Sequence, residues 1–328
     1  MIPVSCAKTK FNLQNSFDRF TILLLKIKDP DREQTDCCNL LAEIDFMKYY
    51  ILLLGIVIIS CKKNNDDETI TPPEKTLLNT AYGSDAAQKM DIYLPAGRSS
   101  SKTKVMIMIH GGAWGSGDKI DFNAYVDSLK KREPSYAIFN INYRLSTNGT
   151  NTFPAQENDV KAAIEFIYSK RNDYAISDKF VLLGGSAGGH LALLQGYKYD
   201  NPVKVKAIVD FFGPTDMVDI YNNPASPFIP ASIIATIVGA TPVTNASLYQ
   251  QSSPVNFVTS QSPPTIILHG GLDPLVSPNQ SIALRNKLQI AGVTYQYVFY
   301  PTEAHGWAGA SMTDSFNKIH AFLNANVN

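Results

Sequence analysis

The sequence predicts an α/β fold, in which a mostly parallel sheet of eight strands has helices on both faces. The expected strands are short, unbroken apolar runs such as 105–109, and such runs are typical of strands that are buried on both faces. Longer segments such as 155–171 lie between them, with apolar residues at helical spacing. Apolar strands that alternate with amphipathic helices indicate a parallel sheet covered by helices.

Eight strands and three long helices are expected along the chain. The strands are expected at 76–82 and 90–94, which form an antiparallel hairpin, and at 104–109, 137–143, 179–183, 205–209, 265–268 and 294–300. The helices are expected at 155–171, 279–291 and 312–324, and another begins after Ser186. Between Asp216 and Pro263 the pattern loosens and prolines accumulate, which indicates a small cap insertion over a pocket or a packed surface excursion.

A serine lies in a glycine-rich turn between an expected strand and an expected helix. The segment Gly184-Gly185-Ser186-Ala187-Gly188 follows the apolar run 180–183 and precedes the helix-like run 190–194. In this context a G-x-S-x-G pattern indicates a tight turn that exposes the serine hydroxyl. The flanking glycines are needed because a Cβ would collide with the crowded backbone. Ser186 is therefore the candidate nucleophile.

A nucleophilic serine needs a base, a carboxylate that orients the base, and N–H donors for the oxyanion. Candidates for all three follow expected strands, in the order that this chemistry has on open parallel sheets. The segment 110–114 (His-Gly-Gly-Ala-Trp) comes first, Asp273 lies after the strand at 265–268, and His305 follows the last strand. The carboxyl ends of parallel strands share one edge of the sheet, so these residues are expected to meet there.

Four of the five histidines have simpler roles than catalysis. His110 is expected to hold the glycine loop by hydrogen bonds, His190 to pack or cap, His269 to be structural and His320 to lie on a solvated helix face. Only His305 is a loop residue after the last strand, which makes it the candidate base.

Two other aspartates compete with Asp273 for the role of the acid. Asp210 interrupts an apolar run, and Asp216 follows a Gly-Pro-Thr segment where it also suits a helix N-cap. Some hydrolases place their acid after this earlier strand, so both remain alternatives to Asp273.

Several segments together resemble the carboxylesterase branch of the α/β-hydrolases, in the hormone-sensitive-lipase-like group. They are the His-Gly-Gly-Ala-Trp motif, 142–145, 153–160, the Gly-Gly-Ser-Ala-Gly-Gly-His motif, the loop 269–273 and the Ala-His-Gly at 304–306. The nearest subgroup that the chain resembles is the bacterial feruloyl or acetyl-xylan esterase-like one. The resemblance covers about 76–322 and implies an α/β-hydrolase fold.

The resemblance also implies roles for the site residues. Ser186 is the nucleophile, Asp273 the acid and His305 the base, and the oxyanion donors are backbone N–H groups of Gly111, Gly112 and Ala187. The group usually has a third glycine where Ala113 stands here, which leaves the donor pair open. Candidate pocket walls, each of which could equally be ordinary core, are Trp114, Tyr143, Phe228 and Trp307.

The expected reaction is two-step hydrolysis of carboxylic esters, with plant polysaccharide esters (acetyl or feruloyl) as the leading substrates. This chemistry needs no metal and no organic cofactor. An arylformamidase-like amidase or a serine peptidase is the alternative, since the same triad cleaves amides, and a non-catalytic binding protein is a further one. The chain has 29 basic and 29 acidic residues and therefore lacks the basic footprint of a nucleic-acid-binding protein.

The N-terminal part of the chain has the features of an export signal. Residues 47–60 combine a basic start with a short apolar core, which describes a signal peptide. The segment Ile58-Ile59-Ser60-Cys61 resembles a bacterial lipobox, so Cys61 is expected to carry a lipid at the head of a polar linker, 61–75. Membrane contact is then expected only through this anchor, on an exported lipoprotein of the bacterial outer membrane.

Two explanations remain for the residues that precede this signal. Met47 as the true initiator makes 1–46 an artefact of the gene model, and the alternative is a genuine extension with an internal signal anchor. The hydrolase domain is expected at 76–328. Cys6, Cys37 and Cys38 all lie within 1–46, which leaves Cys61 as the single cysteine of the expected mature chain.

Overall fold

A computed structural model describes residues 71–328 of the chain. The expected extension 1–46, signal peptide 47–60, lipid site Cys61 and residues 61–70 of the linker lie outside the described residues. Within 71–328 no helix is both long and apolar enough to cross a membrane.

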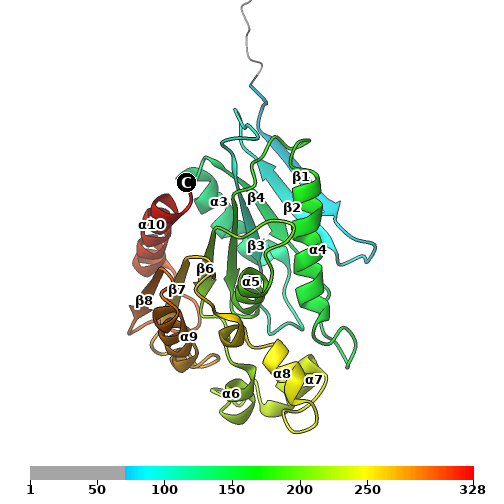
Figure 1. The fold of residues 1–328 in the computed structure, drawn as a ribbon, viewed down its shortest axis with the longest axis vertical. Helices are drawn as coiled ribbons and strands as arrows, with labels where there is room; N and C mark the ends of the chain where they lie inside the picture. Colours follow the sequence, from blue (N-terminus) through cyan, green and yellow to red (C-terminus); the bar gives the residue numbers. More distant parts are fainter. Residues whose placement is uncertain (1–70) are drawn as a thin grey trace, which may run out of the picture. The chain divides into compact units, whose positions relative to one another are not determined.

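Eight strands form one sheet, as the sequence predicts (Figure 1). In chain order they are β1 (Lys75–Ala81), β2 (Lys89–Leu94), β3 (Lys104–Ile109), β4 (Tyr136–Ile141), β5 (Phe180–Gly185), β6 (Ala207–Phe211), β7 (Thr265–Gly270) and β8 (Tyr295–Tyr300). Their order across the sheet is β1-β2-β4-β3-β5-β6-β7-β8. The β1–β2 hairpin is antiparallel and β2 is antiparallel to β4, whereas all later neighbours are parallel.

Helices cover both faces of the sheet (Figure 1). One face carries α4 (Ala155–Ser169), α5 (Ala187–Lys198) and α9 (Pro278–Ile290), and the other carries α3 (Asn123–Arg132) and α10 (Gly309–Asn326). Three short helices, α6 (Met217–Asn222), α7 (Ala231–Val238) and α8 (Ala246–Gln251), and the 3-10 turn at Pro254–Phe257 fill the segment between β6 and β7. The predicted insertion therefore exists as a small helical layer beside the sheet's carboxyl edge.

Each face of the sheet has its own hydrophobic core, and alternate side chains of β3 belong to each of them. Val105, Ile107 and Ile109 belong to the core under α4, α5 and α9, whereas Met106 and Met108 belong to the core under α3 and α10. Successive side chains of a strand point to opposite faces, so a strand between two helical layers is apolar at most positions.

The structure shifts some of the predicted boundaries. Strand β6 begins and ends two residues later than expected, so Asp210 lies inside the strand. Helix α10 begins at Gly309 rather than at residue 312, and α4 ends at Ser169 rather than at residue 171. Helix α3 was not predicted from the sequence, because only its residues Val126 and Leu129 are buried and its apolar stripe is thin.

Candidate active site

Ser186 occupies the turn between β5 and α5 in a backbone conformation that few residues adopt. Its φ is 54° and its ψ −123°, and its N–H donates to the carbonyl of Phe211 at 2.8 Å. The motif glycines permit the turn, because a Cβ on Gly184 would lie 2.2 Å from the carbonyl oxygen of Gly188. A Cβ on Gly188 would lie 1.9 Å from the carbonyl oxygen of Ile109. The neighbouring strand β3 is thus too close to the turn for any side chain at this position.

Asp273 and His305 form a hydrogen-bonded pair at the ends of β7 and β8. His305 Nδ1 donates to Asp273 Oδ2 at 2.7 Å, and the other carboxylate oxygen accepts the N–H groups of Leu275 and Val276. Burial acts to raise the pKa of Asp273, but the hydrogen bonds from His269 and His305 outweigh it and hold that pKa well below its usual range. The carboxylate therefore stays charged and fixes the His305 tautomer with Nε2 free to accept a proton.

His269 is a second imidazole on the same carboxylate, a contact that the sequence analysis missed. Its Nε2 lies 3.2 Å from Asp273 Oδ2 and 3.0 Å from the carbonyl oxygen of Val276. Since a carbonyl only accepts, Nε2 carries the hydrogen, and Nδ1 accepts from the Ser281 hydroxyl at 2.7 Å. The four-residue spacing to Asp273 was the available signal, but the sequence could not show which way the ring points.

Ser186 and His305 face the same hollow, although within 71–328 the Ser186 hydroxyl has no hydrogen-bond partner. Catalytic hydrogen bonds are often long in a free enzyme and tighten with substrate. The structure therefore brings together the three residues predicted as nucleophile, acid and base around one pocket edge.

The predicted oxyanion loop lies against the nucleophile turn. A Cβ on Gly111 would lie 3.0 Å from the carbonyl oxygen of Gly185 and 3.2 Å from the Cβ of Ser186, so the loop packs closely on the nucleophile turn. Within the described residues, no backbone acceptor takes the N–H groups of Gly111, Gly112 or Ala187. Three unpaired donors beside a serine hydroxyl are what an oxyanion hole requires.

Two buried aromatic residues hold this loop. The His110 ring donates from Nδ1 to the carbonyl of Gly111 at 2.7 Å, as expected for a loop-holding histidine. It stacks on the Tyr143 ring, with centroids 4.4 Å apart, and the Tyr143 hydroxyl donates to the carbonyls of His110 and Gly111. The prediction of Tyr143 as a pocket wall is therefore wrong: its ring is fully buried and supports the loop from behind.

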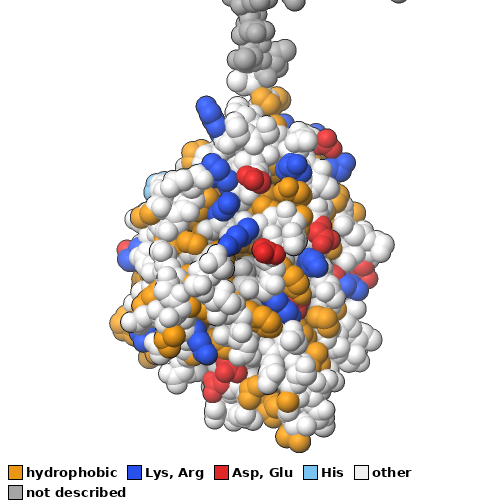
Figure 2. All heavy atoms as spheres, viewed as in Figure 1, with side chains coloured by type: hydrophobic (Ala, Val, Ile, Leu, Met, Phe, Trp, Pro, Cys, Tyr) orange, Lys and Arg blue, Asp and Glu red, His pale blue; other side chains and the backbone are white. Residues whose placement is uncertain are grey.

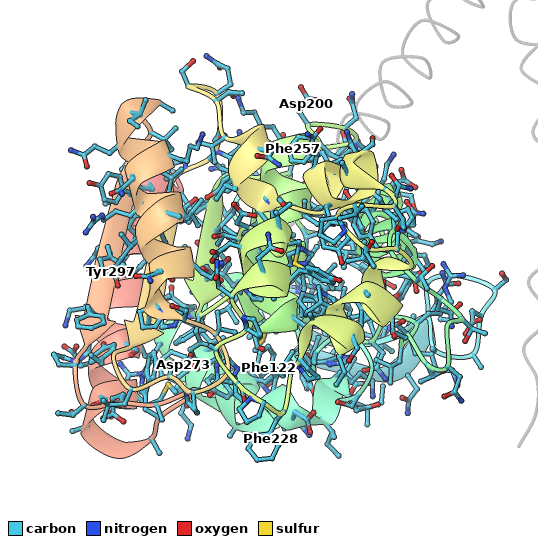
Figure 3. The ribbon with its side chains drawn as sticks, turned by 90° about the horizontal axis from the view of Figure 1, so that it is seen from below. Phe122, Asp200, Phe228, Phe257, Asp273 and Tyr297 are labelled. Atoms are coloured by element: carbon cyan, nitrogen blue, oxygen red, sulfur yellow. The ribbon has the colours of Figure 1, made fainter. Side chains whose placement is uncertain are left out.

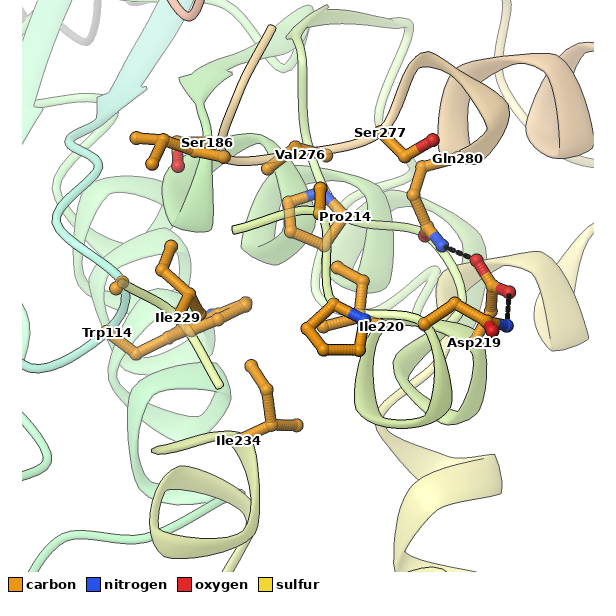
Figure 4. A pocket seen from close by; sticks show the side chains of 15 residues that line it. Trp114, Ser186, Pro214, Asp219, Ile220, Ile229, Ile234, Val276, Ser277 and Gln280 are labelled. Atoms are coloured by element: carbon orange, nitrogen blue, oxygen red, sulfur yellow. Dashed lines mark hydrogen bonds between the residues drawn. The ribbon is translucent and has the colours of Figure 1, made fainter. Parts of the chain in front are cut away.

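Two hollows meet at Ser186. Only some of the predicted pocket walls line either of them. Trp114 lines the smaller hollow (Figure 4). Phe228 is 81 % exposed at the periphery and lines neither hollow, because its ring points outward from the insertion (Figure 3). Trp307 packs against Phe211 and Phe212 and donates to the Ser315 hydroxyl, and it lines a separate hollow beside α10 rather than either hollow at Ser186. The predictions for Phe228 and Trp307 are therefore wrong.

The two alternative acids have other roles. Asp216 caps α6 by accepting the N–H groups of Val218 and Asp219, the role that its sequence context suggests. Asp210 is fully buried within β6, where burial raises its pKa to about 7, and its Oδ1 accepts the N–H of Gly213. Neither carboxylate is bonded to His305 in the described structure.

The remaining histidines are structural. His190 Nδ1 accepts from the Trp114 indole at 3.1 Å and Nε2 donates to the carbonyl of Ser252 at 2.7 Å, while burial lowers its pKa to about 4. His320 contacts the buried carboxylate of Glu133 through Nδ1 at 2.8 Å, so it is more than a solvated helix residue. In the part of the chain that the structure describes, no three His, Cys, Asp or Glu residues are grouped as metal ligands.

The sequence of the domain matches a known protein family. The profile of the BD-FAE family matches residues 90–288, more than half of the chain, and this span includes Ser186 and Asp273. The chain belongs to the BD-FAE family. The expected resemblance to the hormone-sensitive-lipase-like esterases is thereby confirmed, and so is the α/β-hydrolase fold.

Several named relatives of this BD-FAE protein are esterases, and others are dipeptidyl peptidases such as dipeptidyl aminopeptidase BIII of Pseudoxanthomonas mexicana, which is 25 % identical over 68 % of this chain and 33 % of its own. Esterase LipQ of Mycobacterium tuberculosis is 30 % identical over 250 residues, which cover 68 % of this chain and 58 % of LipQ. A carbohydrate esterase from gut microbiota is similar in structure, with a TM-score of 0.66, 27 % identity, and coverage of 76 % of this chain and 95 % of that one. A bifunctional GH43-CE protein of Bacteroides eggerthii has a TM-score of 0.65 and 28 % identity over 75 % of this chain and 38 % of its own.

The matched region spans about half to two thirds of the length of the curated relatives. Within that region the chain shares the α/β-hydrolase fold of these esterases.

Proposed function

We propose that the protein hydrolyses carboxylic esters through a Ser186–His305–Asp273 triad. The observation that carries the proposal is the Asp273–His305 hydrogen bond of 2.7 Å at the edge of a hollow that Ser186 also lines. An oriented, neutral imidazole beside an exposed serine can act as general base.

The reaction follows from these positions. His305 takes the proton of Ser186 as Oγ attacks the ester carbonyl, and N–H groups of Gly111, Gly112 and Ala187 stabilise the oxyanion. His305 then gives the proton to the departing alcohol, and a water activated by the same imidazole releases the acid. Asp273 keeps its charge throughout and stabilises the imidazolium.

The proposed substrates are esters of carbohydrates. Support comes from structural relatives described as carbohydrate esterases and from a large, aromatic-rich hollow beside Ser186 that suits sugar or aryl rings.

The test is ester hydrolysis by the full chain and by its Ser186→Ala variant, on aryl acetate, methyl ferulate and acetylated xylan. Loss of the catalytic serine is expected to lower kcat by on the order of 10⁶, as in other serine hydrolases. Ser101→Ala, in an exposed loop, is the matched control and should keep full activity. Equal activity of Ser186→Ala and wild type would refute the triad, and activity on formamides or peptides alone would point to an amidase.

We further propose that Cys61 carries a lipid and anchors the protein to the outer membrane. The support is the sequence Ile58-Ile59-Ser60-Cys61 behind an apolar segment. In a bacterial host, Cys61→Ala should stop incorporation of labelled fatty acid and move the hydrolase out of the membrane fraction. A lipid on the Cys61→Ala chain would overturn the assignment.

A further inference from the structure

The two hollows that meet at Ser186 differ greatly in size. The small one has a volume of about 20 Å³ and the large one about 420 Å³. Twenty cubic ångströms is about the room that one water molecule or one methyl group needs. Four residues line both hollows and therefore mark their junction: Ala113, Ser186, Ile229 and Leu275.

The catalytic groups distinguish the two hollows. Among the described residues, His305, Gly111 and Gly112 line the large hollow and not the small one. In the tetrahedral intermediate on Ser186, the oxyanion must face N–H donors and the alcohol oxygen must lie within reach of His305, which protonates it. Both of these substituents therefore point toward the large hollow, and the acyl substituent is left with the small one.

The small hollow is apolar near Ser186 (Figure 4). Trp114 and Ile220 face each other across it, and Ile234 of α7 closes the end away from Ser186. Its polar side chains are engaged with one another, because Asp219 accepts from Gln280 at 2.6 Å and from Asn223 at 2.8 Å. A methyl group fits such a site, whereas an acyl group with its own carboxylate would be repelled by Asp219.

The large hollow is wide and is lined by aromatic rings. Four aromatic rings line it, from Phe122, Tyr125, Phe211 and Phe212, with the Phe122 and Tyr125 centroids 5.1 Å apart. Its volume of about 420 Å³ accommodates a sugar or an aryl alcohol.

From this division we infer that the small hollow is the acyl site, that the large hollow is the alcohol site, and that the enzyme is an acetylesterase rather than a feruloyl esterase. The inference rests on the proposed function and names its substrate class. Ile220 and Ile234, both from the helical insertion, set the acyl length.

The first test is an acyl series on the wild-type full chain, with 4-nitrophenyl acetate, butyrate and hexanoate, and with methyl ferulate. We expect kcat/KM to be at least about tenfold higher for acetate than for butyrate, since single methylenes in such pockets change rates by about 10-fold or more. Methyl ferulate should be hydrolysed more slowly than any of the aryl esters. Butyrate or ferulate turned over as well as acetate would overturn the inference.

A pair of variants then asks which hollow holds the acyl group. Ile220→Ala enlarges only the small hollow and should reduce the preference for acetate over butyrate by about tenfold. Phe122→Ala, its counterpart in the large hollow, should leave that preference within about twofold and lower kcat/KM on acetylated xylan. The reverse pattern would mean that the acyl group lies in the large hollow.

Labelling of Ser186 by a fluorophosphonate separates failure of the inference from failure of the proposed function. A labelled protein that prefers long acyl chains contradicts only the acyl assignment. A protein that is neither labelled nor active on any ester contradicts both.

Discussion

Unusual backbone conformations gather around the nucleophile. Eight non-glycine residues in the described chain have positive φ, and three of them are asparagines, which tolerate this region. Of the other five, four line the hollows at Ser186: Ala113 (48°), Trp114 (58°), Ser186 (54°) and Phe212 (45°). Strain of about 1–3 kcal/mol per residue persists only where the surrounding structure imposes it, and it is typical of functional sites.

His269 is expected to tune the triad without contacting substrate. Its Nε2–H, held by the Val276 carbonyl, lies 3.2 Å from Asp273 Oδ2 and helps to keep the pKa of that carboxyl low. We predict that His269→Asn lowers kcat by about tenfold with KM within about twofold, since only the transition state develops charge on His305. The acid side of the kcat pH profile should move toward higher pH, because an Asp273 carboxylate that has lost the Nε2–H of His269 is a stronger acceptor and binds the proton of the His305 imidazolium more tightly.

The Ser281→Ala variant serves as the control for His269. Ser281 donates to the far ring nitrogen at 2.7 Å, so its removal should change kcat in the same direction but less. If His269→Asn leaves the pH profile unchanged and lowers the melting temperature, then His269 stabilises the fold but does not tune the triad.

Asp210 is expected to make the fold less stable as pH rises. Burial raises its pKa to about 7, whereas an aspartate in an unfolded chain titrates near 3.9. The folded state therefore binds the extra proton between about pH 4 and pH 7, and stability declines across this interval. Asp210→Asn keeps an acceptor for the Gly213 N–H but removes the charge, so its free energy of unfolding should exceed that of wild type by on the order of 2 kcal/mol at pH 8.

Urea unfolding between pH 4.5 and pH 8 measures this difference. Asp216→Asn is the control, since asparagine also caps helices and should leave the pH slope unchanged. Parallel pH slopes for wild type and Asp210→Asn would show that Asp210 is not the group responsible.

At the scale of elements, the strand–turn–helix unit around Ser186 depends on one close contact with β3. A Cβ on Gly188 would meet the carbonyl oxygen of Ile109 at 1.9 Å, and Ile109 is held in place by its pairing with Gly184 in the β3–β5 ladder. We predict that Gly188→Ala lowers the free energy of unfolding by at least about 3 kcal/mol and abolishes esterase activity. Thermal melts and ester hydrolysis measure both effects.

Gly185→Ala is a control within the same turn. Its Cβ would come no closer than 3.4 Å, to the ring of Phe122, so its melting temperature should stay within a few degrees of wild type. Comparable losses in both variants would mean that the turn is sensitive to any added methyl group, rather than to this single contact.

The sequence was sufficient for the elements whose pattern is local. Unbroken apolar runs predicted central strands such as β3 and β5, because strands between two helical layers are mostly apolar. Helix α3 was missed, since it buries only Val126 and Leu129 and therefore has little periodicity. The predicted pocket walls were wrong for a different reason: whether Tyr143 or Trp307 faces the hollows at Ser186 depends on distant elements that the local sequence does not specify.

Some features of the site could likewise be predicted from local sequence, and others could not. The order of Ser186, Asp273 and His305 follows from a chain-order rule, and the structure brings these three residues to one edge of the sheet. The contact of His269 with Asp273 and the unequal hollows depend on side-chain directions and on the insertion, so they appear only in three dimensions.

At the scale of the whole molecule, residues 70–328 form one compact unit. Charged residues of both signs are interspersed over the face seen in Figure 2, in keeping with the balanced composition. All eight strands and every predicted site residue except Cys61 belong to this unit. The carbonyl of Pro72 accepts the N–H of Gly97 at 2.8 Å, so the unit uses the chain from about residue 71 onward.

We therefore predict that a chain of residues 71–328 unfolds in a single transition and keeps kcat/KM on 4-nitrophenyl acetate within about twofold of the full chain. A chain that ends at residue 308 is the contrasting case, because it lacks the four large apolar side chains that α10 buries: Phe316, Ile319, Phe322 and Leu323. At about 1.5–3 kcal/mol each, their loss is comparable to the whole stability of a domain, about 5–15 kcal/mol. The shorter chain should thus fail to fold, as judged by near-ultraviolet circular dichroism. Loss of activity from 71–328, with its melting transition intact, would instead mean that residues before 71 take part in the site.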